Sequence, residues 1–153
     1  MAITALLAMT AGRAAAETTD GAVITVSDMT IEPGKEAAVD INYSLTDGKQ
    51  YVGFRFQVEL PEGLTFVEDP ENEGNPWYDD TLTSIAKLNI TATANGAFAA
   101  TPRTAKSTIS GTQGVLMRVK VKAAENLAKG TTLTVKLTDV SVNHRDENYN
   151  VSK

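Results

Sequence analysis

The chain has 153 residues, enough for one domain, and its 14 Lys and Arg against 19 Asp and Glu give a net charge of −5. It has no cysteine, which excludes disulfides, thiolate metal sites and a cysteine nucleophile. The acidic balance gives no electrostatic basis for a nucleic-acid partner, and an aromatic content of 6% is low for a module that binds sugars by stacking.

The first sixteen residues have the pattern of a signal peptide. An apolar run over residues 2–9 is followed by three alanines at 14–16, an Ala-x-Ala cleavage pattern before Glu17. No Lys or Arg precedes the run, so we expect the natural start to lie upstream. We predict an exported protein (extracellular, cell-surface or periplasmic) whose domain is residues 17–153. The alternatives are an Ala-rich N-terminal tail or a helix of a cytoplasmic protein. No later segment is apolar enough to cross a membrane.

Short apolar–polar alternations separated by turn signals then follow along the chain. The early strands are predicted over residues 23–26, 37–45, 52–60 and 64–67, with turns at 32–35 and 46–49. Residues 68–80 form an acidic segment in which Pro and Gly are expected to prevent regular structure. The Asn95-Gly96 pair predicts a hairpin that joins residues 88–93 to residues 97–101.

The most regular alternation covers residues 52–60. The side chains predicted to face inward are Val52, Phe54, Phe56, Val58 and Leu60. Those predicted to face outward are Gly53, Arg55, Gln57 and Glu59. Burial of five apolar side chains would contribute a gross stabilisation of about 7–15 kcal/mol. A slip by one residue would bury an arginine and a glutamate, so the register is strongly specified.

Two later alternations complete the predicted sheets. In the first, the expected inward side chains are Val115, Met117, Val119 and Val121, and the outward ones are Arg118, Lys120 and Lys122. In the second, Leu133, Val135 and Leu137 alternate, and the phase then shifts near Asp139 to Val140 and Val142. This shift predicts a β-bulge or a change of sheet. About eight or nine short strands without a long helix predict a β-sandwich, either immunoglobulin-like or jelly-roll.

The order of these segments resembles the cohesin family, in the form found in secreted Bacteroidales-type proteins. The resemblance lies in Gly53-Phe-Arg-Phe-Gln-Val-Glu-Leu60 running into Pro61-Glu-Gly-Leu-Thr-Phe66, then in residues 114–122 and 137–142, and it covers about residues 22–143. Cohesins are similar in fold to cellulose-binding modules. The resemblance implies an all-β, nine-stranded jelly-roll sandwich and a non-catalytic role, in which one flat sheet face holds a dockerin module of a partner protein outside the cell.

Carried over by position, the resemblance implies a binding face made of four strands. Residues 53–59 and 116–122 would lie side by side, and residues 88–93 and 97–101 would complete the face. The outward side chains of this protein-binding face would be Arg55, Gln57, Glu59, Leu116, Arg118 and Lys120. Such a mixed-charge face suits specific docking between proteins.

The acidic segment 68–80 carries the alternative sites. Trp77 and Tyr78 would stack on sugar rings in a carbohydrate-binding module, or would anchor the segment to the edge of the sandwich. Four carboxylates are candidates for calcium, or are simply solvated: Asp69, Glu71, Asp79 and Asp80. A purely structural domain of a surface protein is a further alternative.

The sequence gives little support for catalysis. His144 is the only histidine and stands beside Arg145, beyond the last predicted strand. Without a second histidine or a cysteine, neither a Ser-His-Asp arrangement nor a cysteine pair is supported. A segment broken by Pro and Gly is a poor scaffold for the two acids of a glycosidase. We therefore expect no enzyme and no cofactor other than calcium.

Overall fold

The computed structural model describes residues 17–19, 21–27, 29–81, 88–104, 108–109, 112–128, 131–145 and 151–152. The predicted signal peptide, residues 1–16, lies outside this part of the chain. All regular elements of the described residues are strands. This part of the chain contains no helix that is long and apolar enough to span a bilayer.

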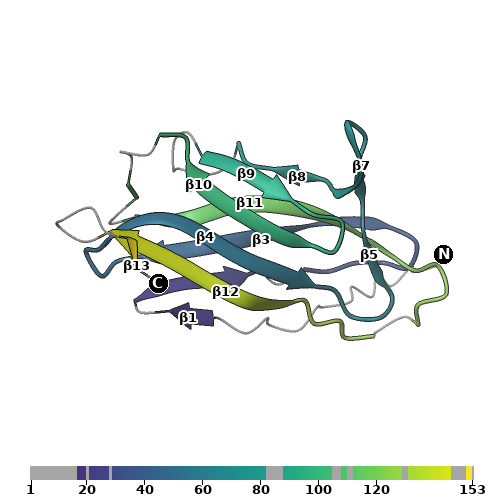
Figure 1. Cartoon of the computed structure of the whole chain (residues 1–153). Coiled ribbons are helices and arrows are strands. Elements are labelled where there is room, and N and C mark those ends of the chain that lie inside the picture. Colours follow the sequence, from purple (N-terminus) through teal and green to yellow (C-terminus); the bar gives the residue numbers. More distant parts are fainter. Residues whose placement is uncertain are drawn as a thin grey trace.

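The strands form two stacked sheets and one small ribbon (Figure 1). The first sheet has the order β1 (Glu17–Thr19), β2 (Ala22–Val26), β3 (Glu36–Leu45), β11 (Thr112–Ala123) and β5 (Leu64–Phe66), and β8 (Tyr78–Asp79) also pairs with β11. The second sheet has the order β13 (Val151–Ser152), β12 (Lys136–Arg145), β4 (Gln50–Glu59), β10 (Ala97–Pro102) and β9 (Leu88–Ala92). The ribbon pairs β6 (Glu68–Asp69) with β7 (Asn72–Pro76).

The core lies between the two sheets and is built from alternate residues of the long strands. On β3 the apolar–polar alternation predicted over residues 37–45 is confirmed, because the side chains that are at most 3% exposed are Val39, Ile41, Tyr43 and Leu45. On β4, Phe54, Phe56 and Val58 are buried as predicted. Phe56 stacks on Phe98 of the neighbouring β10, with ring centroids 5.8 Å apart. The all-β sandwich predicted from the alternations is therefore confirmed.

A bulge near the start of β4 changes which residues face the core there. The pairing with β12 joins Gly53 to Asn143 and Tyr51 to His144, so Val52 is the extra residue. Tyr51 is 1% exposed and fills the core position, whereas Val52 is only half-buried. The prediction that Val52 faces inward was wrong because strict alternation does not continue through a bulge.

A second bulge interrupts β11 at Leu116. The register with β3 shifts between Val115 and Met117, and both Leu116 and Met117 are completely buried. Val115 is half-buried. The predictions that Val115 points inward and Leu116 points outward were therefore both wrong, because two consecutive side chains turn into the core at this point.

The bulge predicted near Asp139 is confirmed. The pairing of β12 with β4 shifts between Thr138 and Ser141, and Asp139 has a positive φ of 52°. Both halves of β12 pair with β4, so the strand stays in one sheet.

Local turn chemistry produces the two hairpins that follow β5. Residues 68–80, predicted to be irregular, instead form the ribbon and β8. The carboxylate of Asp69 accepts hydrogen bonds from the backbone N–H of Glu71 and from Asn72 Nδ2, which closes the turn between β6 and β7. The Asn95-Gly96 hairpin pairs β9 with β10 as predicted, and Gly96 has a φ of 82°.

Candidate functional site

The residues of the predicted binding face lie on two opposite sides of the sandwich. Strand β4 belongs to the second sheet and β11 to the first, so the predicted side-by-side arrangement of these strands was wrong. Arg118 and Lys120 lie on the first sheet, and Leu116 is completely buried and cannot contact a partner. Alternation along a strand tells which of its residues share a face, but it does not tell which strands are neighbours.

The other three predicted strands do share a sheet, and β12 takes the place predicted for β11. We call the outer surface of β12, β4, β10 and β9 the β4 face. Its outward residues follow from the strand registers and are Lys136, Thr138 and Ser141 on β12; Arg55, Gln57 and Glu59 on β4; Ala97, Ala99 and Thr101 on β10; and Asn89 and Thr91 on β9. The surface is polar, and small side chains predominate on β10.

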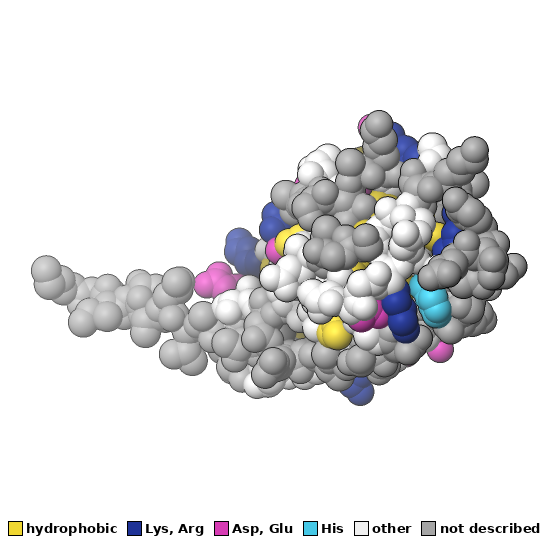
Figure 2. Space-filling model, turned by 90° about the vertical axis from the view of Figure 1, so that its left-hand side faces the viewer, with side chains coloured by type: hydrophobic (Ala, Val, Ile, Leu, Met, Phe, Trp, Pro, Cys, Tyr) yellow, Lys and Arg dark blue, Asp and Glu magenta, His cyan; other side chains and the backbone are white. Residues whose placement is uncertain are grey.

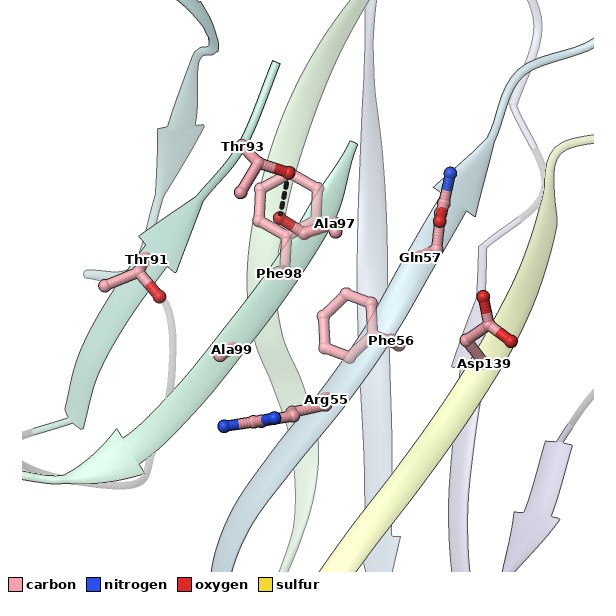
Figure 3. Close-up of a pocket in the computed structure, with 9 residues that line it drawn as sticks. All are labelled: Arg55, Phe56, Gln57, Thr91, Thr93, Ala97, Phe98, Ala99 and Asp139. Carbon is pink, nitrogen blue, oxygen red and sulfur yellow. Dashed lines mark hydrogen bonds between the residues drawn. The ribbon is translucent and has the colours of Figure 1, made fainter. Parts of the chain in front are cut away.

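A pocket of about 330 Å³ opens on the β4 face (Figure 3). Arg55 lies beside Ala99, and its side chain extends from β4 towards β10. Asp139 stands on β12, on the other side of β4. The depression forms because Ala97 and Ala99 supply little side-chain volume between the longer side chains of β4 and β9.

Several polar groups of the β4 face are already held by the protein itself. Gln57 Nε2 donates to the backbone carbonyl of Asn95 at 3.2 Å. The Thr93 hydroxyl donates to a backbone carbonyl 3.4 Å away (dashed in Figure 3). The Thr138 hydroxyl donates to Glu59 Oε1 at 3.0 Å. These bonds fix side-chain positions before any partner arrives, which lowers the entropy cost of binding.

The charged side chains of Arg55 and Asp139 in the pocket are not held by hydrogen bonds to other described residues. Among the described residues, neither Arg55 nor Asp139 has a hydrogen bond or ion pair with its side chain. Arg55 is exposed, and so is Asp139. Within the described part of the chain, the pocket therefore offers an unpaired guanidinium on one side of β4 and an unpaired carboxylate on the other.

On the opposite side of the sandwich, the two predicted basic residues are engaged within the chain. Arg118 donates to Asp40 through Nε at 2.5 Å and through a second nitrogen at 3.0 Å, and this pairing raises the pKa of the guanidinium. The ammonium of Lys120 lies 4.1 Å from the ring centroid of Trp77. These contacts join β3, β11 and the segment before β8, so both residues stabilise the first sheet.

The two aromatic residues proposed for sugar stacking are only half-exposed. The Tyr78 hydroxyl donates to the carbonyl of Ile90 at 3.0 Å, and its ring meets Phe98 edge-on at 6.3 Å. Removal of this ring from water raises the pKa of Tyr78. These contacts support the interpretation of Tyr78 as an anchor. Every aromatic side chain in the described part of the chain is buried or half-buried.

The four carboxylates proposed for calcium do not converge. No group of three or more acidic or histidine side chains that could hold a metal ion occurs within the described residues. Asp69 is taken up by the turn of the ribbon, and Asp79 accepts hydrogen bonds from the Thr81 hydroxyl and backbone N–H. In both residues these bonds lower the carboxyl pKa.

His144 lies within β12 rather than beyond the last strand, which corrects the sequence prediction. Its ring is half-buried and meets Tyr51 edge-on, with centroids 6.4 Å apart. Figure 2 views this end of the sandwich, where the described basic, acidic and other polar side chains are interspersed. The surroundings are those of a packed residue at the end of a strand.

The sequence reasoning missed the part of the site that lies on β12. The shift in alternation near Asp139 was visible in the sequence, and it predicted the bulge. It gave no indication that the bulge adjoins Arg55, because that proximity depends on the pairing of β12 with β4. The sequence also did not indicate that the small side chains of Ala97 and Ala99 leave room for a pocket, because small residues in a strand carry no signal of a pocket.

Comparison with known proteins identifies the fold. No family model matches the sequence, and no curated protein matches it. Among solved structures, a type I cohesin from Clostridium thermocellum, in a complex with a dockerin, has a TM-score of 0.59 at 14% identity, covering 88% of this chain and 92% of that one.

Two further cohesin structures are similar to this chain. The sixth cohesin of scaffoldin B from Acetivibrio cellulolyticus, in complex with a dockerin, has a TM-score of 0.55 at 16% identity over 79% of this chain and 83% of that one. A type III cohesin from a cell-surface anchoring scaffoldin of Ruminococcus flavefaciens has a TM-score of 0.55 at 16% identity over 93% and 88%. The jelly-roll form of the predicted sandwich is thus confirmed, and the chain has the cohesin fold.

Proposed function

We propose that this chain is an exported, non-catalytic docking module that binds another protein, of the dockerin type, through the β4 face. The observation that carries the proposal is the state of that face, where neighbouring polar groups are held in place and the side chains of Arg55 and Asp139 have no partner among the described residues. Cohesins of the same fold have been solved in complexes with dockerins, which supports a partner of this type. The signal-peptide pattern supports export.

The free groups define what the partner must supply. Arg55 lies towards the middle of the face, and an arginine in such a place binds best to a carboxylate, by two parallel hydrogen bonds. The small side chains of Ala97 and Ala99 leave room for a protruding side chain of the partner beside the Arg55 guanidinium. We therefore expect the partner to present an acidic side chain to Arg55 and a donor or cation to Asp139.

A role as a sugar-stacking module is less well supported for this face. Such modules offer aromatic rings to the apolar faces of sugars. All aromatic side chains of the described part of the chain are buried or half-buried. The described aromatic residues that line the pocket are Phe56 and Phe98, and both belong to the core. The composition of the β4 face favours a protein surface.

The test uses charge reversal on each side of the sandwich. The chain is immobilised, secreted proteins of the source organism are captured, and the captured module is purified for titration by calorimetry. Arg55→Glu should weaken binding by about 30-fold or more, because a buried interfacial charge pair is lost and replaced by repulsion, at a cost of about 2–5 kcal/mol. Lys122→Glu is the matched control, since Lys122 is an exposed cation on the first sheet.

A charge swap makes the test specific. If an acidic residue of the partner contacts Arg55, its replacement by Arg should restore binding to Arg55→Glu and to no other variant. Equal binding by Arg55→Glu and the wild type, or a loss of binding only with Lys122→Glu, would refute the assignment of the β4 face. A signal restricted to glycans would refute the docking function altogether.

A further inference from the structure

A second pocket lies at the edge of the second sheet, where the ribbon of β6 and β7 meets β9. It has a volume of about 230 Å³. Asp69, Asn72 and Asn75 contribute from the ribbon, Tyr78 from β8, and Ile90 and Thr91 from β9. Thr91 also lines the pocket of the β4 face, so the two pockets are neighbours. Apart from Thr91, the described residues that line this second pocket lie outside the β4 face.

The pocket presents hydrogen-bonding groups that have free capacity. The carboxamide of Asn75 and the hydroxyl of Thr91 have no hydrogen bond with any residue in the described ranges. Asn72 donates from Nδ2 to Asp69 at 2.7 Å, which leaves its carbonyl oxygen available. Asp69 accepts from Asn72 and from the N–H of Glu71, and a carboxylate can accept further bonds. Planar amide and carboxylate groups of this kind can bridge adjacent hydroxyls of a ligand.

The pocket also has an apolar side, and it is formed in advance. Ile90 and the half-exposed ring of Tyr78 lie against it. The hydrogen bond from the Tyr78 hydroxyl to the Ile90 carbonyl holds β8 against β9 at 3.0 Å. A ligand with hydroxyls on its edges and C–H groups on its faces would satisfy both sides, and this combination is characteristic of a sugar ring.

The charge of the lining and the volume of the pocket restrict the class of ligand that it can bind. Among the described residues, the lining contains no Lys, Arg or His, and Glu68 and Glu71 stand on the same ribbon as Asp69. An acidic sugar would be repelled by these carboxylates. Pockets for drug-sized ligands are about 300–1,000 Å³, so this smaller pocket suits a single ring. We propose that the pocket binds one residue of a neutral sugar, free or at the end of a glycan.

The test is a titration of the full chain followed by two-dimensional ¹⁵N–¹H NMR. The ligands are neutral monosaccharides (glucose, galactose, mannose and xylose) and glucuronate, each to about 50 mM, which detects dissociation constants in the millimolar range. At least one neutral sugar should shift the amides of residues 72–78 and 90–92, and glucuronate should shift them less. Arg55→Glu should bind the sugar as the wild type does, which separates this site from the docking face.

Two variants test the residues. Asn75→Ala should weaken sugar binding about tenfold, the effect of a lost hydrogen bond of about 1.4 kcal/mol. Thr91→Val, which keeps the shape of an exposed strand residue, should weaken it several-fold. Glu73→Gln, on the same ribbon but outside the lining, should leave it unchanged. Absence of shifts with all four neutral sugars, preference for glucuronate, or wild-type binding by both Asn75→Ala and Thr91→Val would overturn the proposal.

Discussion

Truncation of Leu116 to alanine tests the bulge that defines β11. Leu116 and Met117 are adjacent and both have no exposed surface. Burial of a leucine side chain contributes about 1.5–3 kcal/mol, and the cavity left by truncation adds to the loss, so Leu116→Ala should destabilise the protein by about 2–5 kcal/mol. Had the strand alternated strictly, Leu116 would be solvent-exposed and the same substitution would change stability by less than about 0.5 kcal/mol.

The assay is urea denaturation followed by circular dichroism and by the fluorescence of Trp77, the only tryptophan. A thermal scan of the same samples should show a fall in Tm of roughly 5–20 °C. Val115→Ala is the matched control, because Val115 is only half-buried and should lose about 1 kcal/mol or less. A Leu116→Ala loss below about 0.5 kcal/mol, or no greater than that of Val115→Ala, would refute the bulge and the register that follows from it.

Two further predictions concern a turn and a pH-dependent bond. In urea denaturation, Gly96→Ala should lower the free energy of unfolding by at least about 2 kcal/mol more than Gly48→Ala does. The two glycines have similar φ values of 82° and 80°. A Cβ atom at Gly96 would lie 2.7 Å from the ring of Phe66, whereas a Cβ atom at Gly48 would have no neighbour within 4 Å. Equal losses would exclude the close contact. Tyr51→Phe removes the hydrogen bond to Asp47, 2.6 Å long, which holds the carboxyl pKa below its ordinary value of 3.8. A depressed pKa stabilises the fold above that value and the effect disappears as the pH falls through the folded-state pKa, so the loss of about 1 kcal/mol at pH 7 should shrink below about pH 4. A loss independent of pH would contradict this link.

Much of the fold follows from patterns that are local in the sequence. The alternation along β3 and the phenylalanines of β4 identified the core, because a strand in a two-layer sandwich must turn every second side chain inward. The Asn95-Gly96 turn identified the β9–β10 hairpin, because both strands lie within a few residues of it. The change of phase near Asp139 identified a bulge.

The arrangement of the site depended on contacts between distant parts of the chain. Glu59 and Thr138 are joined by a hydrogen bond although 79 residues separate them, and Arg118 and Asp40 are joined across 78. No pattern within β4 indicates that β12 and β10 flank it while β11 lies in the other sheet. For this reason Arg55 and Gln57 lie on the β4 face as predicted, whereas Arg118 and Lys120 lie on the outer side of the first sheet.

The sequence by itself thus determined the all-β class, most of the core and the outward direction of Arg55, Gln57 and Glu59, since these depend on the two-residue period of a strand. Only the tertiary structure decided which strands are neighbours, where Leu116 turns inward and how Asp139 comes to stand across β4 from Arg55. The physical reason is that side-chain direction is set by the backbone geometry of each strand. Strand pairing and bulge position are set by the packing of the whole core.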